Sequence, residues 1–143
     1  MPTLMVPMKL LLPTWPRPCN INQKIMSQHN EVGKIGEDLA RGFLEKNGYK
    51  ILEQNYKTKY SEIDLVAQKN KELVFVEVRT KIGENFGTPE DTLKNKKLSK
   101  VRFNAMSYVA FKKWTGPIKI DAICIVLNKN YTILRLNHYE NIV

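Results

Sequence analysis

The middle of the chain alternates apolar and polar positions around a short polar stretch. Residues 63–67 and 73–78 are mostly β-branched or otherwise apolar, and Asn70 and Lys71 lie between them. Two such runs separated by turn-forming residues are typical of a hairpin. The pattern therefore predicts an antiparallel hairpin whose two-residue loop is Asn70-Lys71.

This loop fixes the register, and the register sorts the side chains onto two faces, because successive strand residues point to opposite sides. One face is wholly apolar and is expected to lie in the core: Ile63, Leu65, Ala67, Val74, Val76 and Val78. The other face starts near the loop with three apolar residues: Val66, Leu73 and Phe75. It ends with Glu62, Asp64, Glu77 and Arg79, so that Glu62 is expected opposite Arg79 and Asp64 opposite Glu77.

Two carboxylates on opposed positions repel each other, so Asp64 facing Glu77 requires compensation. A divalent cation would provide it, because hard cations such as Mg²⁺ bind carboxylate oxygens together with substrate phosphates. The alternative is a solvated sheet edge at which Arg79 neutralises the acids. The apolar residues on the same face argue against simple exposure to solvent. A register shift of one residue would remove the whole arrangement.

The rest of the pattern predicts the order helix, three strands, helix, two strands. Asn30 is a suitable N-cap for a first helix, and Gly48 is suited to end it. A strand over residues 49–56 precedes the hairpin, and a second helix is expected over residues 90–113 after a loop at 82–89. Strands over 118–127 and 131–136 close the chain.

The first 25 residues contain no acidic residue, hold most of the prolines and show no helical or strand period. We interpret residues 1–28 as a disordered leader, with Met26 as an alternative natural start, and residues 29–143 as a single domain. The apolar stretch in the leader is too short for a secretory signal or a membrane span. We therefore expect a cytoplasmic protein without membrane association.

The formal net charge is +9, which favours an anionic partner and nucleic acid in the first place. The second predicted helix carries a run of basic residues: Lys94, Lys96, Lys100, Arg102, Lys112 and Lys113. They are either an ordinary solvated face or a track for a phosphate backbone.

Two further helical residues are candidates for chemistry. Glu37 lies at the edge of the apolar stripe of the first helix, in the same turn as Gly33 and Gly36, although it could simply pair with Arg41. Lys97 lies on the inward row of the second helix, where a lysine either extends along apolar surface or reaches the polar end of the sheet.

Several short motifs now form a series: Gly36-Glu37, Gly48-Tyr49, Asn55, Glu62-Ile63-Asp64, residues 74–79, Lys97 and Asp121. In order and spacing the series resembles the YraN-like family, also called UPF0102, from about Glu31 to the C-terminus. That family is similar to Holliday junction resolvases and to other members of the restriction-endonuclease-like superfamily. The resemblance implies a restriction-endonuclease-like α/β fold, with a central mixed β-sheet of about five strands flanked by helices in the order α-β-β-β-α-β-β.

The resemblance also implies the metal-dependent nuclease signature of that superfamily, an acid on the first helix, an Asp, and then Glu-x-Lys. In this chain the matching residues are Glu37, Asp64, Glu77 and position 79. Glu37, Asp64 and Glu77 are then the expected ligands of Mg²⁺ or Mn²⁺. Arg79 and Lys97 would complete the catalytic set by stabilising negative charge on the phosphate.

Two positions depart from the family pattern. Ser61 stands where many members have glycine, which would strain the backbone if that position needs a positive φ. Arg79 replaces the lysine of the signature. Arginine grips phosphate oxygens in a bidentate manner but cannot act as a base, so Lys97 could supply the missing amine.

These observations lead to the expectation of a nucleic-acid-binding protein that resembles a metal-dependent endonuclease, with Mg²⁺-dependent phosphodiester hydrolysis on branched or duplex DNA. A non-catalytic nucleic-acid-binding module of the same fold is the alternative. A third interpretation is a scaffold whose polar cluster only stabilises the sheet. Junction-cutting relatives act as symmetric dimers, so the resemblance also allows a homodimer.

Overall fold

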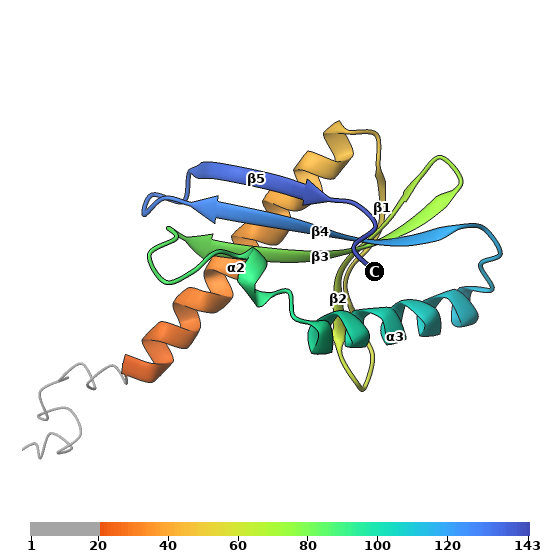
Figure 1. Ribbon diagram of the computed structural model, residues 1–143, viewed down its shortest axis with the longest axis horizontal. Helices are drawn as coiled ribbons and strands as arrows, with labels where there is room; N and C mark the ends of the chain where they lie inside the picture. Colours follow the sequence, from red (N-terminus) through yellow and green to blue (C-terminus); the bar gives the residue numbers. More distant parts are fainter. Residues whose placement is uncertain (1–20) are drawn as a thin grey trace, which may run out of the picture.

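The computed structural model describes residues 21–143, so most of the predicted leader lies outside the described residues. The elements follow in the order α2 (Ile21–Lys46), β1 (Lys50–Lys57), β2 (Glu62–Lys69), β3 (Glu72–Ile82), η1 (Glu90–Thr92), α3 (Asn95–Lys112), β4 (Ile118–Leu127) and β5 (Ile133–Tyr139). This order confirms the predicted succession of helices and strands (Figure 1).

The strands form one five-stranded sheet in the order β1-β2-β3-β4-β5. Neighbours are antiparallel except β3 and β4, which are parallel. A parallel pair needs a crossover connection, and the segment carrying η1 and α3 supplies it. The fold is therefore an α/β fold with a mixed five-stranded sheet flanked by two helices.

The predicted hairpin has the predicted loop, and its register is the predicted one from the loop as far as Leu65 and Val76. The expected opposed pairs Glu62 with Arg79 and Asp64 with Glu77 were wrong, because pairing ends before them. Lys69 pairs with Glu72, and Asn70 has a φ of 56°, as expected for asparagine in a tight two-residue turn. The paired register of β2 and β3 ends at Leu65 and Val76, whereas β2 stays paired with β1 as far as Glu62. The two strands of the hairpin, β2 and β3, therefore separate at the end that carries the acidic residues.

Each face of the sheet packs against one helix (Figure 1). Five of the six predicted core residues of the hairpin contact α2 in one cluster: Leu65, Ala67, Val74, Val76 and Val78. Ile63 was wrongly placed with them, because it is buried in the other cluster together with Val101 and Ala105 of α3. It lies beyond the last residue of β2 that pairs with β3, so the alternation set by β3 does not extend to it.

Three predicted boundaries were also wrong. The first helix begins at Ile21 and runs through Asn30, which is not its N-cap. The second predicted helix is divided, because Lys94 is extended between η1 and α3. The last strand begins at Ile133, because Asn128 closes a turn onto Thr132 first.

Neither long helix of residues 21–143 has an apolar stretch of the length and hydropathy needed to cross a membrane.

A close contact between Gly36 of α2 and Thr80 of β3 sets the distance between helix and sheet. A Cβ atom added at Gly36 would lie 1.7 Å from Thr80 Oγ1 and 2.7 Å from Thr80 Cβ. Only glycine allows such a close approach. Because Glu37 follows directly, this contact also places the Glu37 side chain.

We expect Gly36→Ala to lower the free energy of unfolding by about 1–3 kcal/mol, the usual cost of overpacking. Thr80→Ala in the same chain should recover part of the loss, because it removes the shortest contact, the one to Oγ1. Urea unfolding followed by circular dichroism measures both. Gly42→Ala is the control, since nothing lies within 4 Å of a Cβ at Gly42, and it should be neutral or stabilising. Equal stability of Gly36→Ala and wild type would contradict this account.

Candidate functional site

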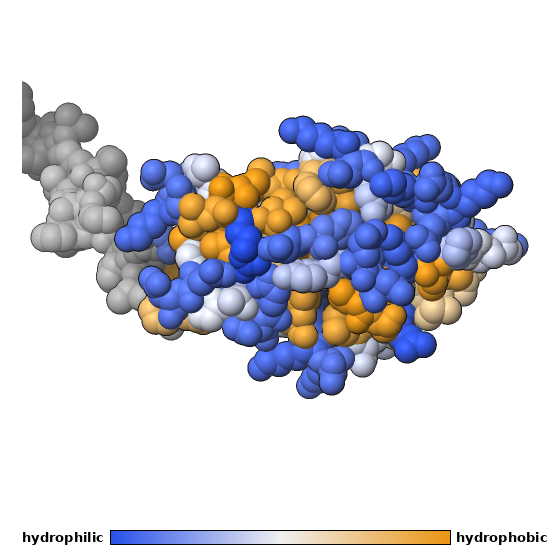
Figure 2. Space-filling view, turned by 45° about the horizontal axis from the view of Figure 1, so that its top comes forward, coloured by the Kyte–Doolittle hydropathy of each residue, from blue (hydrophilic) through white to orange (hydrophobic). Residues whose placement is uncertain are grey.

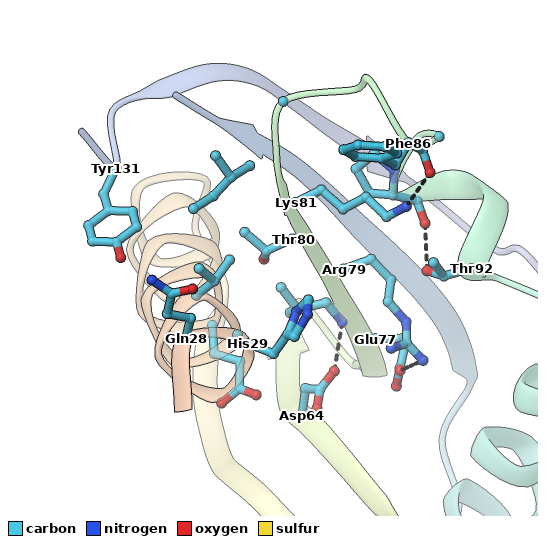
Figure 3. A pocket seen from close by; sticks show the side chains of 18 of the residues that line it. Gln28, His29, Asp64, Glu77, Arg79, Thr80, Lys81, Phe86, Thr92 and Tyr131 are labelled. Carbon is cyan, nitrogen blue, oxygen red and sulfur yellow. Dashed lines mark hydrogen bonds and ion pairs between the residues drawn. The ribbon is translucent and has the colours of Figure 1, made fainter. Parts of the chain in front are cut away.

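A cavity of about 780 Å³ opens where β2 and β3 separate (Figure 3). Its walls come from α2, β2, β3, the loop that follows β3, the start of α3 and the turn between β4 and β5. All five residues predicted for the site line it: Glu37, Asp64, Glu77, Arg79 and Lys97. Tertiary structure thus brings together side chains from two strands and two helices.

Asp64 is positioned by a backbone group of the neighbouring strand. Its Oδ2 atom accepts a hydrogen bond of 2.8 Å from the Val78 N–H. The paired register of β2 and β3 has already ended at this point, so the Asp64 side chain satisfies the Val78 amide as the strands part. Asp64 and Glu77 are therefore close to each other, although they are not directly opposed residues in the pairing of β2 and β3.

Glu77 is almost fully buried, with 1% of its surface exposed. Its Oε1 atom lies 2.9 Å from Arg79 Nη2 and 3.3 Å from Lys97 Nζ. Its Oε2 atom is buried and has no hydrogen-bond partner among residues 21–143. A buried charged oxygen without a partner is costly, so this atom calls for a proton or a cation.

Three carboxyl groups of the cavity, those of Asp64, Glu77 and Glu37, have raised pKa values. Burial and, second, the Glu77 carboxylate raise the pKa of Asp64 to about 7. Burial also raises the pKa of Glu77, against the opposing effect of Lys97 and Arg79. Burial, followed by the charge of Asp64, raises the pKa of Glu37 to about 7, although a hydrogen bond with Asn55 counteracts it. Deprotonation of all three groups therefore leaves an excess of negative charge that favours cation binding.

The Asp64 and Glu77 pair fits a hard divalent cation. It offers carboxylate oxygens, a repulsion that a cation would relieve, and the unpartnered Oε2 of Glu77. Glu37 does not join them in a compact set of three. Among residues 21–143, one trio of His, Cys, Asp or Glu has ligand atoms within 4.8 Å of one another, and it consists of Asp121, His138 and Glu140.

Arg79 and Lys97 supply the positive charge of the site. Arg79 uses Nη2 for Glu77, while its Nε is buried without a partner. One donor of the guanidinium is therefore not satisfied by any group in the part of the chain that the structure describes. Lys97 reaches Glu77 from the first turns of α3, so it does not merely extend along apolar surface.

Ser61 does not strain the backbone. The non-glycine residues of the described chain with positive φ are Asn55, Asn70, Lys113, Tyr131 and Asn141. Ser61 is not one of them, and its hydroxyl accepts a hydrogen bond from the Asn104 side chain of α3. The expected conformational cost at position 61 is therefore absent.

The sequence analysis missed a second polar cluster, around Asp121. This residue is fully buried; its Oδ2 lies 2.8 Å from His138 Nε2, and its Oδ1 accepts a bond of 2.9 Å from the Asn141 N–H. Lys119 Nζ lies 2.7 Å from Glu140 Oε1 and 3.7 Å from Asp121 Oδ2. The lysine already compensates these acids, so the cluster ties the C-terminal segment to β4. The sequence signal that could have revealed this cluster is Asp121 itself, an acid inside the mostly apolar run 118–127.

Comparison with known proteins shows the family of this chain. The model of "Uncharacterised protein family UPF0102" matches residues 36–125, which include all five predicted site residues. The chain belongs to the UPF0102 family. It is similar to a UPF0102 protein of Flavobacterium johnsoniae, 39% identical over 115 residues that cover 79% of this chain and 94% of that protein. A UPF0102 protein of Lawsonia intracellularis is 43% identical over 113 residues, which cover 78% of this chain and 84% of the relative.

The raised pKa values make the acids of this UPF0102 chain a source of instability at neutral pH. The pKa of Asp64 rises from 3.8 to about 7 on folding, so the folded state binds the proton more tightly. Stability should then fall as the pH rises from about 4 towards 7, because the unfolded state binds fewer protons over that range.

We expect Asp64→Asn to be more stable than wild type at pH 8, by on the order of 1–2 kcal/mol, and to gain nothing at pH 4. Asparagine can still accept the Val78 hydrogen bond, so the substitution removes mainly the charge. Thermal unfolding of both proteins across this pH range is the measurement. Glu45→Gln, at an exposed pair with Arg41, is the control and should change little at any pH. A destabilised Asp64→Asn at pH 8 would show that the charge contributes favourably.

Proposed function

We propose that this protein binds nucleic acid, with DNA as its substrate, and hydrolyses phosphodiester bonds with the help of Mg²⁺ or Mn²⁺. The observation that carries the proposal is the pair Asp64 and Glu77, with the unpartnered Oε2 of Glu77, beside Arg79 and Lys97 in one cavity. Carboxylates that hold a cation next to basic groups that hold phosphate form a site suited to phosphoryl chemistry.

Each residue has a role that follows from its place. Asp64 and Glu77 would hold the cation, which when bound polarises a phosphoryl oxygen and lowers the pKa of water. Arg79 and Lys97 would turn from Glu77 to the phosphate and stabilise the negative charge that develops there. Glu37, which lines the same cavity from α2, would orient a water molecule.

Basic residues outside the cavity would position the backbone without reading the base sequence. Lys94, Lys96 and Lys100 are exposed on or next to the first turns of α3, close in sequence to Lys97. The chain has a formal net charge of +9. Hydrophilic side chains cover much of the face shown in Figure 2, with apolar patches between them.

The second candidate function is nucleic-acid binding without cleavage. It is favoured by the two ion pairs of Glu77, which already compensate that carboxylate, and by Arg79, which cannot act as a base. In this case the same cavity would bind a phosphate group through Arg79 and Lys97 alone.

Cleavage and binding assays separate the two functions. With Mg²⁺ or Mn²⁺, we expect wild type to cut fluorescently labelled branched or duplex DNA. Asp64→Asn should cut it at least ~100-fold more slowly, because loss of a residue that binds the metal directly should cost more than loss of a residue that only supports such a ligand. DNA affinity of Asp64→Asn should be unchanged or higher, since a negative charge is removed. Glu45→Gln should behave as wild type. Binding that weakens with salt, without product under either metal, would decide for the non-catalytic function.

Metal binding has its own test. We expect Mn²⁺ to raise the melting temperature of wild type, with a larger effect at pH 7.5 than at pH 5.5, because the carboxyl groups must lose their protons to bind. Glu77→Gln should abolish the shift, whereas Asp121→Asn should retain it, although its basal melting temperature should be lower. Loss of the shift in Asp121→Asn alone would place the cation at Asp121, His138 and Glu140 instead.

A further inference from the structure

The upper walls of the cavity carry two exposed aromatic side chains. Phe86 comes from the loop between β3 and η1 and is 98% exposed, and Tyr131 comes from the turn between β4 and β5 and is 36% exposed. Both line the cavity that holds Asp64 and Glu77, and they approach it from different elements (Figure 3). The proposed chemistry of the acids and bases uses neither aromatic ring.

The loop that presents Phe86 is fixed by polar contacts. Arg135 of β5 forms ion pairs with Glu84 and Glu90, which flank the loop. The carbonyl oxygen of Phe86 itself accepts a hydrogen bond of 3.4 Å from Lys81 Nζ. Because the backbone of this loop is anchored, a flat group that stacks on the exposed Phe86 ring has to restrict only the side-chain rotamers.

Tyr131 occupies its position despite an unfavourable backbone conformation. Its φ is 62°, in the left-handed region that bulky side chains rarely adopt. Asn128 holds the turn, because its carbonyl oxygen accepts the Tyr131 N–H at 2.9 Å and its Oδ1 accepts the N–H groups of Asn130 and Thr132. Strained residues gather at sites of function, and here the strain places an aromatic ring at the cavity.

Basic residues line the cavity together with the two rings. Lys81 and Lys129 belong to its walls, and Arg79 and Lys97 contact Glu77. Aromatic rings next to lysines suit a nucleotide strand, because each base offers a flat face for stacking and each phosphate a negative charge. A base inside a duplex is already stacked between its neighbours and cannot lie on these rings without leaving the helix.

We propose that the cavity receives unpaired nucleotides beside the phosphodiester held by the acids, with one base stacked on Phe86 and another on Tyr131. The substrate class is then nucleic acid with a single-stranded or unpaired segment, in preference to continuous duplex. This inference rests on the proposed function, since Asp64, Glu77 and Arg79 fix where the backbone lies.

The test compares two labelled DNAs of equal length and sequence, a plain duplex and the same duplex with a bulge of unpaired nucleotides, by fluorescence anisotropy in Ca²⁺. Wild type should bind the bulged DNA at least ~5-fold more tightly, the lower range for stacking of one base. Phe86→Ala should lose this preference and keep its affinity for duplex. Phe103→Ala is the matched control, because Phe103 is 57% exposed on α3 outside the cavity, and it should retain the preference.

Abasic residues in place of the bulged nucleotides identify the contact as stacking. They should remove the preference of wild type and have no further effect on Phe86→Ala. Tyr131→Asn provides a variant that should fold better, since asparagine tolerates a φ of 62°, and it should still weaken the preference. A preference that survives Phe86→Ala, or survives abasic residues, overturns the inference.

The outcomes also separate this inference from the proposed function. Equal affinity of wild type for both DNAs, together with cleavage that depends on Asp64, overturns the unpaired nucleotide and leaves the nuclease intact. Failure of wild type to bind either DNA overturns both.

Discussion

The hydrogen bond from the Val78 N–H to Asp64 Oδ2, 2.8 Å long, is the interaction on which the site depends. It forms just where β2 and β3 cease to pair, so a side chain satisfies a backbone donor at the place where the strands separate. The separation opens the cavity, and the bond keeps the Asp64 carboxyl group beside Glu77. Without it, the strands would have either to continue pairing or to leave a buried amide unsatisfied.

The consequence is a concentration of charge that the fold itself does not need. The Oε1 atom of the buried Glu77 contacts both Arg79 and Lys97, whereas its Oε2 atom has no partner among residues 21–143. The pKa values of Asp64 and Glu37 rise to about 7. The Asp121 cluster provides the contrast, because Lys119 and His138 contact its acids and hold the C-terminal segment in place. The acids of the Asp121 cluster are compensated within the protein, whereas the Oε2 atom of Glu77 has no hydrogen-bond partner in the described part of the chain.

Local sequence was sufficient for the hairpin, since the loop at Asn70 and Lys71 and the alternation around it fix the register of Leu65 with Val76. It was also sufficient to select Asp64 and Glu77, because both are acids that interrupt otherwise apolar strand runs on the two sides of the predicted loop. It failed at Ile63, where pairing with β3 has ended, and at Asn30, where a suitable capping residue lies inside a longer helix. In these places packing and helix continuation outweigh the local signal.

The amino-acid sequence by itself determined the family, the order of the elements and the five ionic residues of the site, because these follow from residue types and spacings along the chain. Only the tertiary structure decided that Lys97 contacts Glu77, that Thr80 requires a glycine at position 36, and that Phe86 and Tyr131 border the same cavity as the acids. The reason is physical: each of these contacts joins segments far apart in the chain, and the packing of helices on the sheet, which no local pattern encodes, sets their distances.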